Sequence, residues 1–107
     1  MTRFEIIDAP TLKSWLDRKE AILIDVRELS EYKEAHIPGS ILIPVKNCFP
    51  DSLPQNPDKK IVFHCKSGMR SGSACDLCAR QLEGRQFYNL DGGIAAWIKA
   101  GYEVESA

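Results

Sequence analysis

The sequence has no excess of charge of either sign and no long apolar run. Fourteen Lys and Arg residues stand against fifteen Asp and Glu residues, which gives a formal net charge of -1. A near-neutral chain lacks the basic footprint that nucleic acids and anionic membranes attract, so we expect neither as a partner. No apolar stretch approaches the roughly 18 residues of a membrane-spanning helix. Glu5 and Asp8 stand where a signal peptide needs an apolar core, and these absences predict a soluble, cytoplasmic protein.

Cysteine is sparse as well. Four cysteines in 107 residues (Cys48, Cys65, Cys75 and Cys78) are too few for a disulfide scaffold. Only Cys75 and Cys78 have the close spacing of zinc ligands, and no second pair follows, so we expect no metal and no cofactor. The thiols are expected to be reduced, with Cys75 and Cys78 in the core on the apolar face of a helix. Cys48 lies in a proline-rich loop that allows exposure, and the sequence assigns it no role.

The apolar pattern predicts short strands that alternate with helices. Strand-like runs occur at residues 4–7, 21–26, 41–43, 61–64 and 87–90, and helical patterns follow Asp8 and cover residues 28–34, 71–82 and 93–98. The runs at 21–26 and 41–43 are typical of buried strands. Residues 47–60 are expected to form a long loop with a short helical turn near 51–53. With no repeat or linker in the chain, we predict one α/β domain over residues 1–107, a three-layer sandwich with a parallel sheet.

One loop has the composition of a reactive site. In parallel α/β sheets, chemistry gathers beyond the carboxyl ends of the strands, where helix N-termini present N–H groups. Cys65 follows a buried strand directly and precedes a helix that is expected to begin near Ser71. Gly68 allows the backbone to curl around an anion, and the helix end, Lys66 and Arg70 are expected to lower the thiol pKa. Cys65 is therefore a candidate nucleophile; the alternative is a small apolar plug beside solvated charges.

Three separated stretches resemble the signatures of the rhodanese family. They are LIDVRELSEYKEAHIPGSILIP (residues 23–44), IVFHCKSGMRS (61–71) and YNLDGGIAAWIKAGYEV (88–104), in the family's order. The resemblance implies a stand-alone rhodanese domain, with a five-stranded parallel sheet flanked by helices. It implies a thiosulfate sulfurtransferase in which Cys65 carries sulfane sulfur as a persulfide. The partners would be a small-molecule sulfur donor, thiosulfate or a persulfide, and a thiol, cyanide or protein acceptor.

The length of the cysteine loop separates branches of this fold. In the sulfurtransferases the loop from the cysteine to its last residue has six residues, as from Cys65 to Arg70 here. Phosphatase and arsenate-reductase relatives have seven, which makes room for a phosphate or an arsenate. The resemblance therefore favours sulfur transfer over phosphatase or arsenate-reductase activity. A non-enzymatic persulfide carrier or redox sensor that acts with a protein partner stays open as an alternative.

The candidate substrate-binding residues are those whose N–H groups or cations would face the sulfur and the donor anion. They are Lys66, Ser67, Gly68, Met69, Arg70, Ser71 and Arg27. For Arg27 the alternative is a structural ion pair with Asp25 or Glu31. His64 should point away from Cys65 as a buried neutral histidine, since neighbours on a strand face opposite sides. His36 is expected to fix the turn at residues 38–39, and Gly92 and Gly93 to form a tight turn beside the loop.

Overall fold

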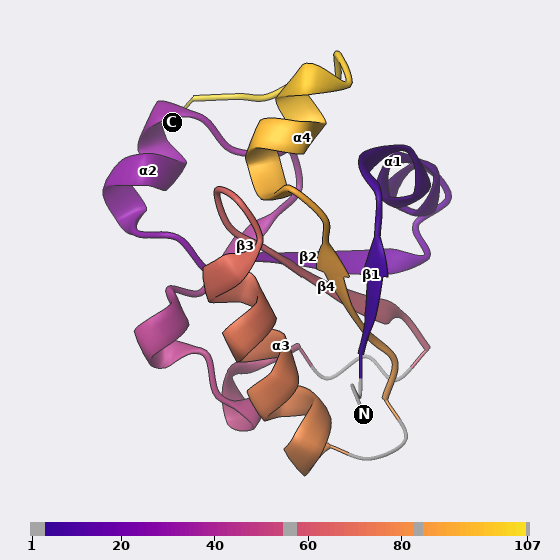
Figure 1. Cartoon of the computed structure of the whole chain (residues 1–107), viewed down its shortest axis with the longest axis vertical. Helices are drawn as coiled ribbons and strands as arrows, with labels where there is room; N and C mark the ends of the chain where they lie inside the picture. The colour runs from indigo at the N-terminus through magenta and orange to yellow at the C-terminus, as the bar shows by residue number, and fades with distance from the viewer. Residues whose placement is uncertain (1–3, 55–57, 83–84, 107) are drawn as a thin grey trace.

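The computed structural model of the chain describes residues 4–54, 58–82 and 85–106. Strands alternate with helices along these residues (Figure 1). The strands are β1 (Glu5–Ile7), β2 (Ala21–Asp25), β3 (Ile41–Leu42), β4 (Lys60–His64) and β5 (Phe87–Leu90). The helices are α1 (Ala9–Asp17), α2 (Leu29–Glu34), α3 (Met69–Gln81) and α4 (Gly93–Lys99), with short 3-10 turns at Val45–Asn47 and Pro50–Ser52. None of the described helices is both long enough and apolar enough to cross a bilayer.

The five strands form one sheet in which every pair is parallel, in the order β1-β5-β4-β2-β3. The predicted α/β fold with a five-stranded parallel sheet is therefore confirmed. The prediction of a buried strand at 41–43 was wrong. β3 is a two-residue edge strand, and the side chain of Ile41 is exposed. An edge strand pairs on one side only, so it does not need the apolar cover of a central strand.

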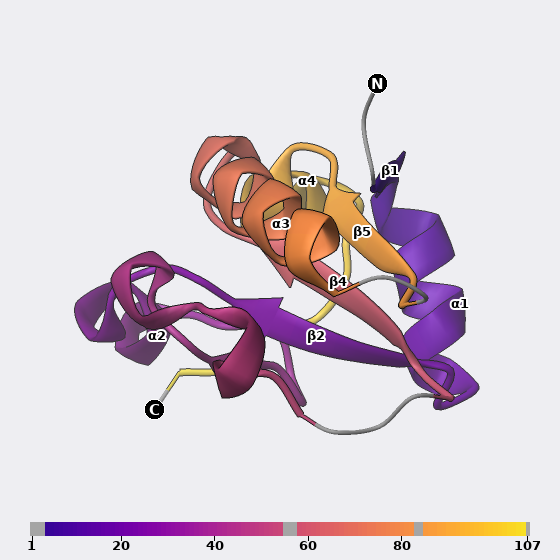
Figure 2. The same cartoon turned by 90° about the horizontal axis from the view of Figure 1, so that it is seen from below.

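Alternate side chains of the central strands belong to two separate cores. Ile24 and Phe63 face the layer that contains α3, whereas their neighbours Leu23 and Val62 face α1 and α4. Figure 2 shows α3 and α1 on opposite sides of the sheet. This alternation follows from the two-residue period of a strand and produces the predicted three layers.

Glycines start the two helices beside the carboxyl edge of the sheet. α3 begins at Met69, two residues before the predicted start at Ser71, because Gly68 at φ +110° ends the preceding loop and is the N-cap. α4 begins directly after Gly92, which has φ +73°. Positive φ is the region that glycine enters without steric cost. Both helix N-termini thereby lie close behind β4 and β5.

The proline-rich segment folds back against α3. The 3-10 turn at Val45–Asn47 leads into this segment, and the one at Pro50–Ser52 lies within it and confirms the predicted helical turn. Residues 55–57 of the predicted loop lie outside the described residues. Cys48 is 1% exposed and packs in the same core as Cys75 and Cys78. The loop position of Cys48 thus does not expose it, because this loop covers the α3 face of the sheet.

Candidate active site

Cys65 lies at the carboxyl edge of the sheet, directly after β4 and beneath the start of α3. Its side chain is 1% exposed. The N–H of Gly68 donates to Cys65 Sγ at 3.1 Å, and the Ser71 hydroxyl oxygen lies 3.4 Å from the same sulfur. The backbones of Ser67 and Ser71 also contribute to lowering the pKa of this thiol. The loop thus forms a cradle of N–H donors around one sulfur atom, which is an arrangement that binds anions.

This cradle favours the thiolate form of Cys65. Burial raises the pKa of the thiol, but the hydrogen bonds from Ser71, Gly68 and Ser67 together outweigh burial, so the pKa lies below its ordinary value. The direction is the one expected from the sequence. The main cause differs, since hydrogen bonds to the sulfur contribute most of the lowering, rather than Lys66 and Arg70.

Asn89 of β5 holds the cradle in place. Its Nδ2 donates to the carbonyl oxygen of Gly68 at 3.1 Å, and its Oδ1 accepts from the Ser71 hydroxyl at 2.6 Å. Asn89 is buried within an otherwise apolar strand. Asn89 was not among the predicted site residues, although a polar side chain inside a buried strand indicates a specific hydrogen-bonding role.

The start of α4 holds the other side of the loop. The N–H of Ile94 donates to the carbonyl oxygen of Cys65 at 2.9 Å, and that of Ala95 to the carbonyl oxygen of Lys66 at 3.3 Å. The backbones approach so closely that a Cβ on Gly93 would overlap the Cys65 carbonyl. The expected tight turn at Gly92 and Gly93 is therefore present, and only glycine fits at its second position.

Arg27 is turned inward and is held by two elements. Its Nε and Nη2 donate to the carboxylate of Asp25 at 3.0 and 2.8 Å, and Nη2 also donates to the carbonyl oxygen of Ala35 at 2.7 Å. Arg27 is 5% exposed and Asp25 is fully buried. Of the two alternatives for Arg27, the structure shows the ion pair with Asp25. Its guanidinium nevertheless lines a depression beside the cysteine loop.

Arg70 and Lys66 are in different electrostatic states. Arg70 makes a two-point ion pair with Glu31, Nη1 to Oε1 at 2.8 Å and Nη2 to Oε2 at 3.0 Å. Because of this pair, the pKa of Glu31 falls to about 2 and that of Arg70 rises. Lys66 is exposed and has no ion-pair partner among the described residues. Met69, also on the loop, is 81% exposed.

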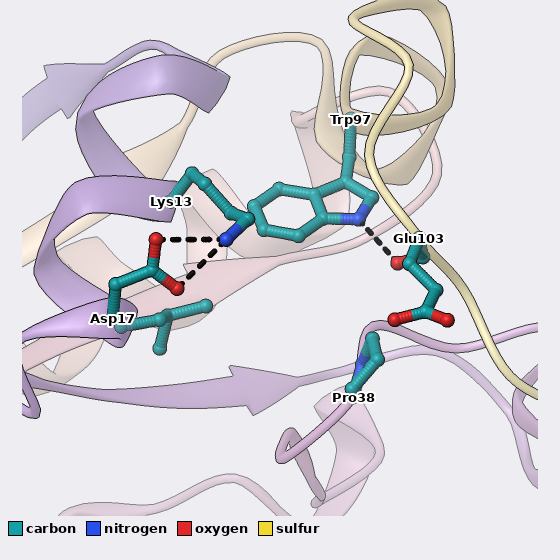
Figure 3. A pocket seen from close by; sticks show the side chains of 6 residues that line it. Lys13, Asp17, Pro38, Trp97 and Glu103 are labelled. Carbon is teal, nitrogen blue, oxygen red and sulfur yellow. Dashed lines mark hydrogen bonds and ion pairs between the residues drawn. The ribbon is translucent and has the colours of Figure 1, made fainter.

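Of two depressions on the described surface, one lies beside the loop. It has a volume of about 180 Å³ and lies between α2 and α4, where Glu31, Glu34, Lys66 and Ile94 contribute to its lining. The other, of about 210 Å³, is shown in Figure 3. Trp97 borders it and donates from Nε1 to the carbonyl oxygen of Glu103 at 2.8 Å. Its lining contains no predicted site residue, whereas Arg27 and Lys66 line the first depression, so we place the chemistry there.

His64 is a buried, neutral residue, as expected. It is fully buried, its Nδ1 lies 3.3 Å from the carbonyl oxygen of Cys65, and its Nε2 lies 3.5 Å from Asp25 Oδ2. Burial lowers the pKa of His64, which keeps the ring neutral. Among the described residues, no group of three or more His, Cys, Asp and Glu side chains is arranged to hold a metal ion.

His36 does not fix the turn at residues 38–39, so that prediction was wrong. Its ring stacks on Tyr32 at 3.9 Å, and its Nδ1 lies 3.0 Å from the Tyr32 carbonyl oxygen. Its backbone pairs with Glu105 near the end of the chain. Ser40 closes the turn instead, with N–H and hydroxyl bonds to the carbonyl oxygen of Ile37. A hydroxyl next to a turn competes well for such a carbonyl, which leaves His36 to tie α2 to the C-terminal segment.

Comparison with known proteins identifies relatives that span most of the chain. A sulfurtransferase from Allochromatium vinosum is 34% identical over 100 residues, which cover 92% of each chain. The thiosulfate sulfurtransferase GlpE of Pseudoalteromonas translucida is 33% identical and covers 79% of this chain and 80% of its own. An uncharacterized protein of Synechocystis is 36% identical over 94% of this chain, which spans only 56% of that longer relative.

Solved structures give the same relationship. The rhodanese-related protein of Thermoplasma volcanium superposes with a TM-score of 0.85 at 30% identity and covers 97% of this chain and 100% of its own. The human single-domain sulfurtransferase TSTD1 gives a TM-score of 0.75 at 29% identity over 88% of this chain and 95% of its own. The family model of the rhodanese-like domain matches residues 8–100, most of the described chain, including the cysteine loop and both helices beside it. The chain therefore belongs to the rhodanese-like domain family.

Proposed function

We propose that this protein is a sulfurtransferase that moves sulfane sulfur from thiosulfate, or a related donor, to a thiophilic acceptor through a persulfide on Cys65. The observation that carries the proposal is the cradle of N–H donors around Cys65 Sγ, which lowers the thiol pKa. The relatives that are named sulfurtransferases support the transferase class. Beyond the transferase class, the proposal specifies thiosulfate as a donor and a persulfide on Cys65 as the intermediate.

The first half-reaction loads the cysteine. The Cys65 thiolate attacks the outer sulfur of thiosulfate and forms a new S–S bond. The donor's own S–S bond breaks, and its electron pair leaves with sulfite. Thiolate and thiosulfate together carry three negative charges, as do the persulfide anion and sulfite, so no proton has to move. This is why the step needs no general base, in keeping with a neutral His64 that is bonded elsewhere.

The second half-reaction transfers the sulfur from Cys65 to the acceptor. Cyanide or an acceptor thiolate attacks the terminal sulfur of the persulfide, the persulfide S–S bond breaks, and Cys65 leaves as the thiolate. The donors from Ser67, Gly68 and Ser71 hold negative charge at the sulfur in both halves of the cycle. Lys66 and Arg70 would bind the anionic end of the donor, and a protein thiol is an alternative acceptor. The free cysteines fit a reducing compartment such as the cytoplasm.

Mass spectrometry and turnover test the proposal together. Incubation with thiosulfate should add one sulfur atom to the wild type and none to Cys65→Ser, and cyanide should then release thiocyanate. Cys75→Ser is the matched control, because its sulfur is also buried but lies within the core. Sulfur uptake that persists in Cys65→Ser would move the site to another cysteine. Loading without turnover on cyanide or thiols would leave a persulfide carrier rather than an enzyme.

Loop length separates the proposal from phosphatase activity. Six residues from Cys65 to Arg70 form a small ring of donors. A phosphoryl group brings three oxygens and needs a wider ring to place donors at about 2.7–3.1 Å. We therefore expect negligible hydrolysis of aryl phosphates, and weaker sulfur transfer when one residue is inserted between Met69 and Arg70. Aryl phosphate hydrolysis by the unmodified protein at rates that rival its sulfur transfer would overturn the loop-length argument.

A further inference from the structure

Only one of the three cations assigned to the donor site lacks a carboxylate partner in the described structure. Arg27 is bound to the buried Asp25, and Arg70 is bound to Glu31, whereas Lys66 is unpaired. A site attracts a doubly charged anion most strongly when its cations have no other anionic partner. The two ion pairs therefore reduce the attraction that this site exerts on thiosulfate.

The Arg70–Glu31 pair lies within electrostatic reach of the reacting sulfur. Charge on Cys65 adds to the effect of Glu31 in raising the pKa of Arg70. Both Nη atoms of Arg70 are engaged by the two oxygens of Glu31. Two oxygens on a planar fork is also the geometry with which a sulfonate binds an arginine. Glu31 and an anionic donor thus need the same face of the same guanidinium.

We propose that Glu31 is a specificity-determining residue, an internal competitor that occupies the Arg70 fork and makes the site favour sulfur donors with no anionic oxygens next to the transferred sulfur. Alkyl persulfides are donors of this class, whereas thiosulfate must displace Glu31 before Arg70 can bind it. The inference rests on the proposed sulfurtransferase function and narrows its substrate class.

Glu31 is held in its competing position by its own helix as well as by Arg70. It is the third residue of α2, and its Oε1 accepts from the N–H of Glu28 at 3.0 Å in a capping box. A glutamine at this position keeps that acceptor and its shape but loses the charge that holds Arg70. Glu34 provides a matched control, because it lies on the same helix, lines the same depression and has no ion pair in the described structure.

Steady-state kinetics with two donors test the competition. We expect Glu31→Gln to lower KM for thiosulfate about three- to fivefold with little change in kcat, which is the upper part of the range of a partly exposed ion pair. KM for the persulfide of 2-mercaptoethanol, which carries no sulfonate or carboxylate, should stay within about twofold on the same argument. Glu34→Gln removes a charge from the same depression without freeing Arg70, so it should lower KM for thiosulfate by less than about twofold. The decrease in KM for thiosulfate should disappear in the double variant Glu31→Gln/Arg70→Ala, because the guanidinium that Glu31 occupies is then absent.

An equal KM for thiosulfate in wild type and Glu31→Gln would overturn the inference. The inference would also fail if Glu34→Gln lowered KM for thiosulfate as much, or if Glu31→Gln lowered KM for the 2-mercaptoethanol persulfide as much. Either result would mean that the effect comes from the overall charge of the depression and not from the release of Arg70. Binding decides the question without turnover: calorimetry with thiosulfate should show tighter binding to Cys65→Ser/Glu31→Gln than to Cys65→Ser. If the wild type transfers sulfur from neither donor, the proposed function fails. The calorimetric comparison still decides whether Glu31 competes with thiosulfate for Arg70.

Discussion

Ser71 donates its hydroxyl proton to Asn89 Oδ1 at 2.6 Å, while the same oxygen lies 3.4 Å from Cys65 Sγ. The orientation of the Asn89 amide is set by its Nδ2, which donates to the Gly68 carbonyl. One hydroxyl has one proton, so Ser71 cannot serve the amide and the sulfur at the same time. When Cys65 loses its proton, the Ser71 hydroxyl can rotate toward the sulfur, and β5 thereby takes part in the ionisation of a residue that follows β4.

Ser71→Ala should make Cys65 less reactive. Loss of one hydrogen bond to the thiolate raises the thiol pKa, and at pH 7 the alkylation rate should fall about fivefold, as expected for roughly 1 kcal/mol. The measurement is alkylation rate against pH, whose midpoint in the wild type should lie below that of free cysteine. Ser73→Ala is the control, since Ser73 is exposed on the same helix. An unchanged midpoint in Ser71→Ala would show that the Ser71 hydroxyl does not stabilise the Cys65 thiolate.

Gly93→Ala should be among the most destabilising single changes in the chain. The new Cβ would overlap the Cys65 carbonyl at a position with φ +57°. We expect a loss of about 3–4 kcal/mol in the free energy of unfolding, from overpacking together with backbone strain. Gly101→Ala has the same conformational problem at φ +88° but meets nothing within 4 Å, so it should cost only about 1 kcal/mol. Urea denaturation of both variants separates the two effects, and equal losses would mean that the contact is unimportant.

Glu31→Gln should reduce stability at neutral pH and not in acid. The pKa of Glu31 is lowered in the folded protein to about 2, against an ordinary value of 4.5. A lowered carboxyl pKa stabilises the fold above the ordinary value, and this contribution is lost as pH falls from 4.5 toward 2. For a pair that is partly exposed, we expect about 1 kcal/mol at pH 7. Thermal unfolding measured from pH 7 to pH 3 should show that the difference in Tm between wild type and Glu31→Gln decreases as the pH falls. A difference in Tm that stays constant over this range would contradict the prediction.

Three of the four thiols should be inert in the folded protein. Burial raises the pKa of Cys75, and a hydrogen bond with Cys78 together with burial raises that of Cys48. The same hydrogen bond lowers the pKa of Cys78, but Cys78 is fully buried in the core on the α3 side of the sheet, out of reach of a reagent. Cys65 has a lowered pKa and lies under the exposed residues Lys66 and Ser67. Iodoacetamide should therefore modify one cysteine in the native state and four in urea. Peptide mapping identifies the sites, and native modification of Cys48 would show that the segment over α3 opens readily.

The local pattern of the chain was enough to predict its elements and the place of Cys65. Apolar runs of strand length, helical spacing and the glycine of the loop are all encoded within a few residues of where they act. The start of α3 was predicted two residues late because Gly68 was assigned to the loop but not recognised as a helix cap.

The contacts that shape the site join residues that are far apart in the sequence. Glu31 meets Arg70 across 39 positions, and Asn89 meets Ser71 across 18. Both pairs exist because β5 and β2 flank β4 in the sheet, and this order is not visible in any local pattern. The burial of Cys48 has a similar origin, since it depends on the path of a loop over the α3 face of the sheet.

The first turn of α4 makes this helix a reporter on the cysteine loop. The N–H groups of Ile94 and Ala95 have no partner within their own helix and instead bond to the carbonyl oxygens of Cys65 and Lys66. Their protons can exchange with deuterated solvent only when the loop separates from the helix. The exchange rates of two backbone amides on a neighbouring element therefore measure how often the cradle opens, without a label on the cysteine.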